Sequence, residues 1–281
     1  LLATIDDGSC NYQMTYVPDD NFEQALINLG YDNVLDDSVL TANINTVTNL
    51  LIYSQNIADL TGIEDFTALT DLYCYSNNLT SLDVSNNTAL THLYCAYNPL
   101  TSLDVSNNTA LTSLWSGGNQ LTSLDVSDNT ALTILGCDNN QLTTLDVSNN
   151  TALTNLWCDD NQLTSLDVSA NTALTSLNCN SNQLTSLDVR NGNNMNFTSF
   201  SSGNNPNLYC IDADYPDYLT LDSIAIMDPW SSFSENCQNE IYGCTDPLLP
   251  NYNPLATLND WSCDYGMTYV PDDNFEQALI N

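Results

Sequence analysis

The sequence predicts a solenoid built mostly of β-strands and turns, with parallel strands stacked into a horseshoe-shaped sheet. The first observation is a 21-residue unit, L-T-x-L-x-C-x-x-N-x-L-T-S-L-D-V-S-x-N-T-A, which recurs six times in succession from Leu69 to the copy that begins at Leu174. The second is that apolar residues alternate within each copy, as in Leu93 and Cys95, which is typical of a half-buried strand. One such strand cannot bury its apolar face alone, whereas stacked copies share a continuous core.

The repeat resembles the leucine-rich repeat, L-x-x-L-x-L-x-x-N-x-L, with cysteine at the third apolar position. The resemblance covers about residues 47–208 and implies a solenoid of about eight turns, whose turns at 47–68 and 197–208 are degenerate. We expect the asparagine of each regular copy to bond the backbone of the neighbouring turn, at Asn77, Asn98, Asn119, Asn140, Asn161 and Asn182. The S-x-N-T-A link is rich in turn-forming residues, so the convex side is expected to be extended or tightly turned.

Residues 12–46 are expected to form a helical N-terminal cap. Asp19 to Asn21 precede the run F-E-Q-A-L-I-N-L, and Gly30 follows it, which are start and stop signals of a helix. Phe22, Leu26 and Leu29 would form one apolar face. Such a helix would cover the open edge of the first repeat, which a solenoid needs against end-to-end aggregation.

The chain also repeats itself on a longer scale. Residues 12–28 and 265–281 match at sixteen of seventeen positions, at an offset of 253, and 1–11 match 254–264 weakly. We therefore expect one period of a long tandem array, with 1–11 ending a preceding disulfide module and 265–281 starting the next cap. A two-copy protein is the alternative. Trp261 stands where the first copy has Gly8. Neighbouring units would be the partners in such an array, and homo-oligomeric bundling is a further arrangement of it.

Composition excludes several classes of function. The chain has 281 residues, with 35 acidic residues against a single lysine or arginine, Arg190, and a net charge of −34. Nucleic acid is excluded as a partner because phosphate binding needs a cationic surface. Membrane insertion is not expected, since no apolar run approaches the roughly 20 residues of a membrane span. With one histidine and no catalytic constellation, we expect no enzyme activity.

The ten cysteines form two groups. Five occupy the same inward apolar position of the repeat, where Ser116 fills the missing place: Cys74, Cys95, Cys137, Cys158 and Cys179. A row of buried free thiols is favoured over a metal or redox site, because no cluster of histidines accompanies them.

The remaining cysteines lie in segments that resemble modules of extracellular leucine-rich repeat surface proteins from gliding, type IX-secreting bacteria. Residues 209–240 resemble their C-terminal cap, which implies a Cys210–Cys237 disulfide. Residues 241–264, G-C-T-D-P through W-S-C, resemble their small disulfide linker module, which implies a Cys244–Cys263 disulfide. Cys10 would be the second cysteine of a preceding module. Disulfides imply an oxidising, extracellular setting at the cell surface.

An aromatic stripe is expected on the outward, concave face of the strands, formed by Tyr53, Tyr73, Tyr75, Tyr94, Tyr97, Trp115 and Trp157. Gly136 is expected to interrupt the stripe, and Asp138, Asp159 and Asp160 border it. Aromatic rings on such a face suit a glycan or a protein partner, such as a surface protein of another cell. Cross-strand packing that only stabilises the sheet is an equal alternative.

Two sets of acidic residues could bind calcium. One is the aspartate ladder, for which we prefer local backbone bonds over divalent ions: Asp83, Asp104, Asp125, Asp146, Asp167 and Asp188. The other lies in the disulfide modules and offers hard oxygen ligands: Asp246, Asn251, Asn253, Asn259 and Asp260, with Asp6 and Asp7 in the other copy. Turn formation by these Asp and Asn residues is the open alternative, and calcium is the one cofactor expected.

Together these features predict a structural and adhesive repeat unit of a giant secreted fibre or cell-surface appendage, which attaches to other cells or surfaces. The alternative is a single glycan- or protein-binding module that uses the aromatic face.

Overall fold

The computed structural model describes residues 12–217, 225–259 and 262–263. The chain divides into two compact units, Leu1–Glu235 and Asn236–Asn281. The first holds an N-terminal cap and the solenoid, and the second holds the small disulfide module.

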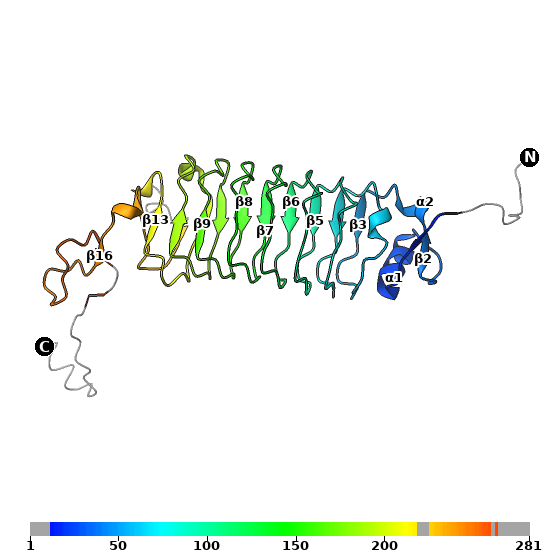
Figure 1. The fold of residues 1–281 in the computed structure, drawn as a ribbon, viewed down its shortest axis with the longest axis horizontal. Helices are drawn as coiled ribbons and strands as arrows, with labels where there is room; N and C mark the ends of the chain where they lie inside the picture. The colour runs from blue at the N-terminus through cyan, green and yellow to red at the C-terminus, as the bar shows by residue number, and fades with distance from the viewer. Residues whose placement is uncertain (1–11, 218–224, 260–261, 264–281) are drawn as a thin grey trace, which may run out of the picture. The chain divides into compact units, whose positions relative to one another are not determined.

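The N-terminal cap contains two short strands and two helices (Figure 1): β1 (Met14–Tyr16), α1 (Asp20–Leu29), β2 (Ser38–Leu40) and α2 (Thr41–Ile44). Strands β1 and β2 pair antiparallel. Helix α1 begins and ends where the sequence predicts: the Asp19 carboxylate accepts hydrogen bonds from the N–H groups of Asn21 and Phe22, and Gly30 ends the helix with a φ of 82°.

The buried face of α1 differs from the predicted one. Phe22 and Leu26 are fully buried, but Leu29 is 41% exposed, so it is not part of the apolar face. Glu23 is fully buried on this helix, and its carboxylate accepts hydrogen bonds from the backbone N–H groups of Asp36, Asp37 and Ser38. This carboxylate holds the loop before β2 against the helix.

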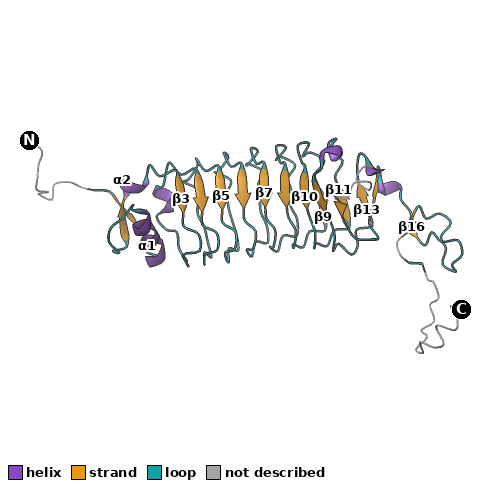
Figure 2. Cartoon of the chain, turned by 180° about the vertical axis from the view of Figure 1, so that it is seen from behind, coloured by secondary structure: helices purple, strands orange, loops and turns teal. Residues whose placement is uncertain are grey.

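The solenoid is built on a nine-stranded parallel sheet, in which each coil adds one short strand beside the last (Figures 1 and 2). Its strands are β3 (Asn49–Leu51), β4 (Asp71–Tyr73), β5 (His92–Tyr94), β6 (Ser113–Trp115), β7 (Ile134–Gly136), β8 (Asn155–Trp157), β10 (Ser176–Asn178), β12 (Ser199–Ser201) and β14 (Ala225–Ile226). Equivalent residues of successive copies are register partners, as Leu93 and Leu114 are. The parallel leucine-rich solenoid predicted from the repeat is therefore confirmed.

A second parallel sheet closes the later coils, in the order β15-β13-β11-β9. It contains β9 (Ser165–Asp167), β11 (Ser186–Asp188), β13 (Cys210–Asp212) and β15 (Ser232–Ser234). Strands β13 and β15 continue the parallel pairing beyond residue 208, so the segment predicted as a C-terminal cap begins with further solenoid strands. Between the two sides the S-x-N-T-A links form turns, as their composition predicts. Single 3-10 turns occur at η1 (Ile63–Asp65), η2 (Asn194–Asn196) and η3 (Cys237–Asn239).

The predicted asparagine row bonds neighbouring coils from inside the solenoid. Asn119 is typical: its amide donates to the carbonyls of Ser116 (2.9 Å) and Cys95 (3.2 Å), and its Oδ1 accepts from the N–H of Leu100 (3.1 Å). Each coil is thus joined to the previous one by side-chain bonds as well as by the sheet.

A second asparagine row, which the sequence analysis did not single out, lies at the N of S-x-N-T-A. Its members are fully buried: Asn87, Asn108, Asn129, Asn150 and Asn171. The Asn129 amide donates to the carbonyls of Val105 and Asn108, both at 2.9 Å, while its Oδ1 lies buried without a hydrogen-bond partner. This asparagine recurs in five of the six copies, with Gly192 at the equivalent position of the sixth, and that recurrence was the available sign of its role.

The five repeat cysteines are buried free thiols, as predicted. Burial raises the pKa of the Cys95 thiol to about 12. Ser116 is also fully buried at the missing place, and its hydroxyl donates to the carbonyl of Gly136 at 3.3 Å. The polar substitution is accommodated because this hydroxyl has a backbone partner.

The second unit contains β16 (Tyr242–Gly243) and β17 (Leu258–Asn259), which pair parallel. The predicted Cys244–Cys263 disulfide is present, with the Cα atoms 4.6 Å apart. Cys210 and Cys237 are each disulfide-bonded. Cys10 lies outside the described residues.

Candidate functional site

The seven predicted aromatic residues form the aromatic face, which lies on the outward side of the nine-stranded sheet. The last residues of β4, β5 and β6 are register partners, so the rings of Tyr73, Tyr94 and Trp115 follow one another. The centroids of Tyr73 and Tyr94 are 4.6 Å apart with an interplanar angle of 11°, and those of Tyr94 and Trp115 are 6.2 Å apart at 11°. The cross-strand packing considered as an alternative therefore exists, and it builds a continuous surface of rings.

The expectation that Gly136 interrupts this stripe is wrong. Gly136 stands between Trp115 and Trp157 in the register, yet the two indoles stack with their centroids 5.0 Å apart and an interplanar angle of 25°. A Cβ atom at Gly136 would lie 2.8 Å from Cε3 of Trp115. The glycine thus leaves the space into which the indoles lean, and the stack passes over its strand.

A second row of rings runs beside the first. Tyr53 and Tyr75 stack at 4.8 Å with an interplanar angle of 2°. Tyr97 is the most exposed member of the face, at 61%, and a Cβ atom at Gly118 would lie 2.5 Å from its ring. The Tyr97 ring therefore rests directly on the backbone of the next coil.

A shallow hollow of about 230 Å³ opens between the two rows, lined by Tyr75, Tyr94, Ala96, Tyr97 and Trp115. Successive coils place Tyr75, Ala96 and Gly117 at the same repeat position. Because Ala96 and Gly117 are small, the row of side chains that begins with Tyr75 has a gap at these two positions. The rings on either side of the gap form the walls of the hollow, and Ala96 lies between them.

In the next two coils, carboxylates take the repeat position of Tyr75, Ala96 and Gly117, as Asp138 and Asp159. A Cβ atom at Gly117 would lie 2.5 Å from Oδ1 of Asp138, so this carboxylate leans over Gly117 toward the preceding coil. Burial, with the charge of Asp160 in addition, raises the pKa of the Asp138 carboxyl. Burial likewise raises the pKa of Asp159, and the charges of Asp138 and Asp160 add to the effect. These groups are partly desolvated and repel one another.

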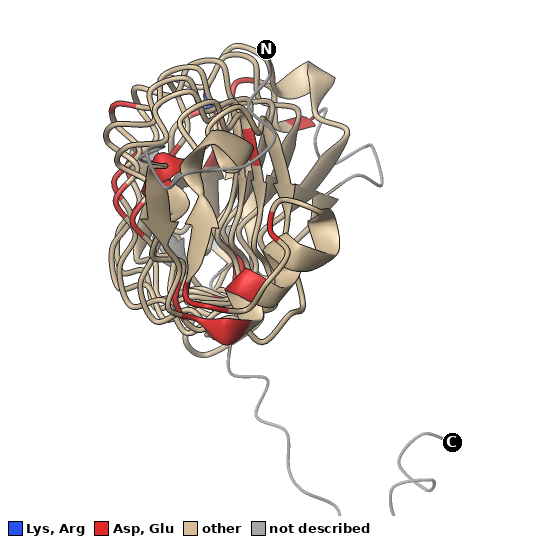
Figure 3. Cartoon of the chain, turned by 90° about the vertical axis from the view of Figure 1, so that its right-hand side faces the viewer, with Lys and Arg blue, Asp and Glu red and all other residues tan. Residues whose placement is uncertain are grey.

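The aspartate ladder behaves differently from this cluster. Asp125 Oδ1 accepts from the N–H of Ser127 at 2.9 Å, and the same bond to the residue two positions on recurs at Asp83, Asp104, Asp146, Asp167 and Asp188. The bonds from Ser127 lower the pKa of Asp125. The preferred interpretation, local backbone bonding, is confirmed, and Figure 3 shows acidic residues on the outer turns of the coils.

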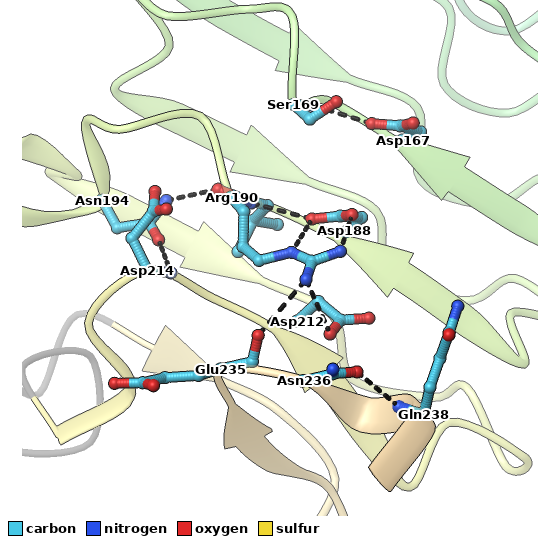
Figure 4. A network of polar contacts seen from close by, with 11 residues as sticks. Asp167, Ser169, Asp188, Arg190, Asn194, Asp212, Asp214, Glu235, Asn236 and Gln238 are labelled. Atoms are coloured by element: carbon cyan, nitrogen blue, oxygen red, sulfur yellow. Dashed lines mark hydrogen bonds and ion pairs between the residues drawn. The ribbon is translucent and has the colours of Figure 1, made fainter.

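The single arginine lies at the C-terminal end of this ladder (Figure 4). Arg190 donates to both carboxylate oxygens of Asp188, from Nε at 3.0 Å and from Nη2 at 2.5 Å, and its Nη1 lies 3.6 Å from Oδ1 of Asp212. Nη1 also donates to the carbonyl of Glu235 at 3.2 Å. Arg190 thus joins the last coils and is not part of the aromatic face.

The predicted calcium ligands are placed only in part. Asp246 and Asn253 each accept a backbone N–H bond from the residue two positions on, at 2.9 and 3.0 Å, as turn-forming residues do. Asn251 donates its amide to a backbone carbonyl, and Asn259 lies in β17. Asp6, Asp7 and Asp260 lie outside the described residues. Within the described part of the chain, no three His, Cys, Asp or Glu side chains are grouped so as to hold a metal ion, and calcium binding stays a prediction.

None of the described helices is long and apolar enough to cross a membrane. The longest of them, α1, has 10 residues.

The chain is similar to known proteins in part of its sequence and in its fold. No family model matches the chain. Over 87 residues, which are 31% of this chain, the sequence is 42% identical to Internalin J of Listeria monocytogenes serotype 4b (strain F2365). The match spans 9% of that relative, so the chain corresponds to only a small part of it.

Two solved structures from the same Listeria strain show the fold. An internalin C2 gives a TM-score of 0.65 at 19% identity, covering 80% of this chain and 100% of that one. An internalin F gives a TM-score of 0.61 at 22% identity, covering 78% of this chain and 71% of that one. The resemblance to proteins of gliding, type IX-secreting bacteria stays a prediction. The chain is a leucine-rich repeat solenoid, similar in fold to internalins and in part of its sequence to Internalin J.

Proposed function

We propose that this chain is an extracellular adhesive module that binds a surface protein of another cell through the aromatic face. The observation that carries the proposal is the continuous stack from Tyr73 to Trp157 with the hollow beside it. Clustered, partly exposed tyrosine and tryptophan rings are typical of the residues that dominate protein interfaces. The similarity to internalins and the disulfides are in keeping with a secreted binding protein.

Binding rather than catalysis fits the composition of this face. Its outward side chains are rings, small residues and carboxylates, and the chain's one histidine, His92, is paired with Asp71 at 2.9 Å. No nucleophile with an adjacent base lies on the aromatic face, whose seven residues are all described.

The test is a screen of the folded chain against displayed cell-surface ectodomains and, in parallel, a glycan array. The variant Trp115→Ala/Trp157→Ala removes both tryptophans of the face, and Asp125→Asn/Asp146→Asn alters the ladder face as the control. The proposal expects ectodomain hits that the tryptophan variant loses and the control keeps. Hits that survive in both variants would place binding elsewhere, and hits confined to glycans would replace the protein partner with a sugar.

We further infer that such units occur in series, as parts of a fibre or surface appendage. The support is the segment 12–28, which recurs at 265–281 with one difference. The mass of the native chain, reduced and denatured, tests this inference. A mass of hundreds of kilodaltons is expected, and a mass near 30.8 kDa would contradict it.

A further inference from the structure

The hollow on the aromatic face has an unusual combination of walls and border. Its lining consists of four aromatic residues and the methyl group of Ala96. The charged groups nearest to it in the repeat are carboxylates, which accept hydrogen bonds and donate none when ionised. A ligand that contacts these carboxylates must therefore supply hydrogen-bond donors, and a positive charge on the ligand would strengthen the contact.

Ring faces favour the same ligand. The face of a tyrosine or tryptophan ring is the negative side of its quadrupole and attracts a cation placed over it. Tyr75, Tyr94, Tyr97 and Trp115 offer several such rings around one hollow. An arginine or lysine side chain can lay its methylene stem against the rings while its charged head reaches the carboxylates.

The carboxylate that follows the hollow along the repeat has no lysine or arginine of the chain beside it. Asp138 belongs to the second coil after Tyr97 and leans over Gly117 of the coil between them, whose carbonyl accepts the N–H of Tyr97 at 2.8 Å. Arg190 is the only lysine or arginine of the chain, and it is bound to Asp188 and Asp212. An incoming cation would therefore meet a partly desolvated carboxylate that no internal cation neutralises.

The charge of the whole chain points the same way. A net charge of −34 attracts cationic partners over long range and repels acidic ones. A neutral pyranose could stack on the same rings, but it gains nothing from this field and meets only acceptors among the charged groups at the border.

We propose that the hollow between Tyr75, Tyr94, Tyr97 and Trp115 receives a lysine or arginine side chain from a basic segment of the partner protein, with its cationic head directed toward Asp138. This inference rests on the proposed function, because it names the chemistry of the partner for the same face.

The experiment measures binding of a 15-residue peptide with four lysines by tryptophan fluorescence and calorimetry in 0.15 M salt. The decisive variant is Ala96→Leu, which fills the hollow and leaves the charge unchanged. Asp138→Asn and Asp125→Asn form a matched pair, since each removes one charge, one beside the hollow and one on the ladder face. Norleucine and glutamate versions of the peptide and a methyl pyranoside are the control ligands.

The proposal expects Ala96→Leu and Asp138→Asn each to weaken the lysine peptide at least fivefold, and Asp125→Asn to weaken it less than twofold. Equal binding by wild type and Ala96→Leu would overturn it, because attraction to net charge alone would then explain the affinity. Tight binding of the pyranoside, or equal binding of the norleucine peptide, would also overturn it. If an ectodomain still requires Trp115 and Trp157 while these peptides fail, the proposed function stands and only the cationic ligand is wrong.

Discussion

The indole rings of Trp115 and Trp157 stack at 5.0 Å although the strand that carries Gly136 lies between their own strands. In-register strands lie about 4.8 Å apart, so residues two strands apart would ordinarily be too distant for ring contact. The missing side chain at Gly136 allows both rings to lean inward. One glycine thereby joins two parts of the aromatic face.

Gly136→Ala is expected to break this stack. The added Cβ would lie 2.8 Å from Cε3 of Trp115, which forces the indole to move. Such overpacking costs about 1–3 kcal/mol of unfolding free energy. Near-ultraviolet circular dichroism and urea unfolding measure the two effects. Gly203→Ala is the matched control, since its Cβ would meet nothing closer than 3.5 Å, and an equal effect of both variants would contradict the account.

Asparagines of the two rows are expected to contribute different amounts to the free energy of unfolding. Asn140→Ala removes the Oδ1 that accepts the N–H of Leu121 and the amide that bonds Ser116 and Cys137. Asn150→Ala leaves only carbonyls without their side-chain donor, because the Oδ1 of Asn150 has no partner to lose.

Each buried group left unpaired costs about 1–3 kcal/mol, so Asn140→Ala is expected to lower the unfolding free energy more than Asn150→Ala. Chemical denaturation of both variants measures the difference. The reverse order would show that the Oδ1 bond to the previous coil contributes little.

The five repeat thiols are expected to resist alkylation in the folded chain. Burial raises the pKa of Cys95 and of Cys179 to about 12, so almost no thiolate exists at pH 8. Iodoacetamide labelling followed by peptide mass spectrometry should find these cysteines unmodified in buffer and modified in denaturant. Rapid labelling of Cys95 in buffer would contradict their burial.

Two sets of aspartates should affect stability in opposite directions as pH changes. Because the pKa of Asp138 is raised, the folded chain holds that proton more tightly than the unfolded chain does. Its contribution to stability is therefore greatest at low pH and falls as the pH rises from the ordinary carboxyl pKa through the raised one. The pKa of Asp125 is lowered, so its contribution is present above the ordinary value and is lost as the pH falls through the lowered one.

Asp138→Asn is accordingly expected to raise the Tm at pH 7, with no gain at pH 3. Asp125→Asn is expected to lower the Tm at pH 7, because the charged acceptor of the Ser127 N–H is lost. Thermal melts of both variants from pH 3 to pH 8 measure this. A lower Tm for Asp138→Asn at pH 7 would show that its charge is stabilised by a contact other than those described.

The repeat made the solenoid predictable, because an invariant period fixes which residues share a face. The Asn77 row, the buried thiols and the seven aromatic positions follow from period alone. The hollow does not, since it depends on Ala96 and Gly117 being small where neighbouring copies are large. The role of Gly136 was missed for the same reason. In the repeat pattern the glycine looks like a gap in the aromatic row, whereas in the structure the indoles of Trp115 and Trp157 lean into the space above it.

The degenerate ends were harder to predict than the regular copies. Strands β13 and β15 extend the sheet beyond residue 208, although their sequences no longer match the 21-residue unit. Backbone pairing on an existing edge needs only an apolar inward residue, such as Ile211, and not the full consensus. The burial of Glu23 on α1 was also missed, because the apolar pattern does not show that three backbone N–H groups of the loop before β2 satisfy its carboxylate.

The central claim is that the aromatic face is the binding surface. Its most direct test is the dissociation constant of one ectodomain from the screen for wild type, Trp115→Ala/Trp157→Ala and Asp125→Asn/Asp146→Asn, with circular dichroism confirming that each variant folds. Loss of the two indole rings is expected to weaken binding at least tenfold, since each buried aromatic anchor contributes about 2 kcal/mol or more. The ladder control should change binding by less than twofold. Equal affinity of the tryptophan variant and wild type would contradict the claim.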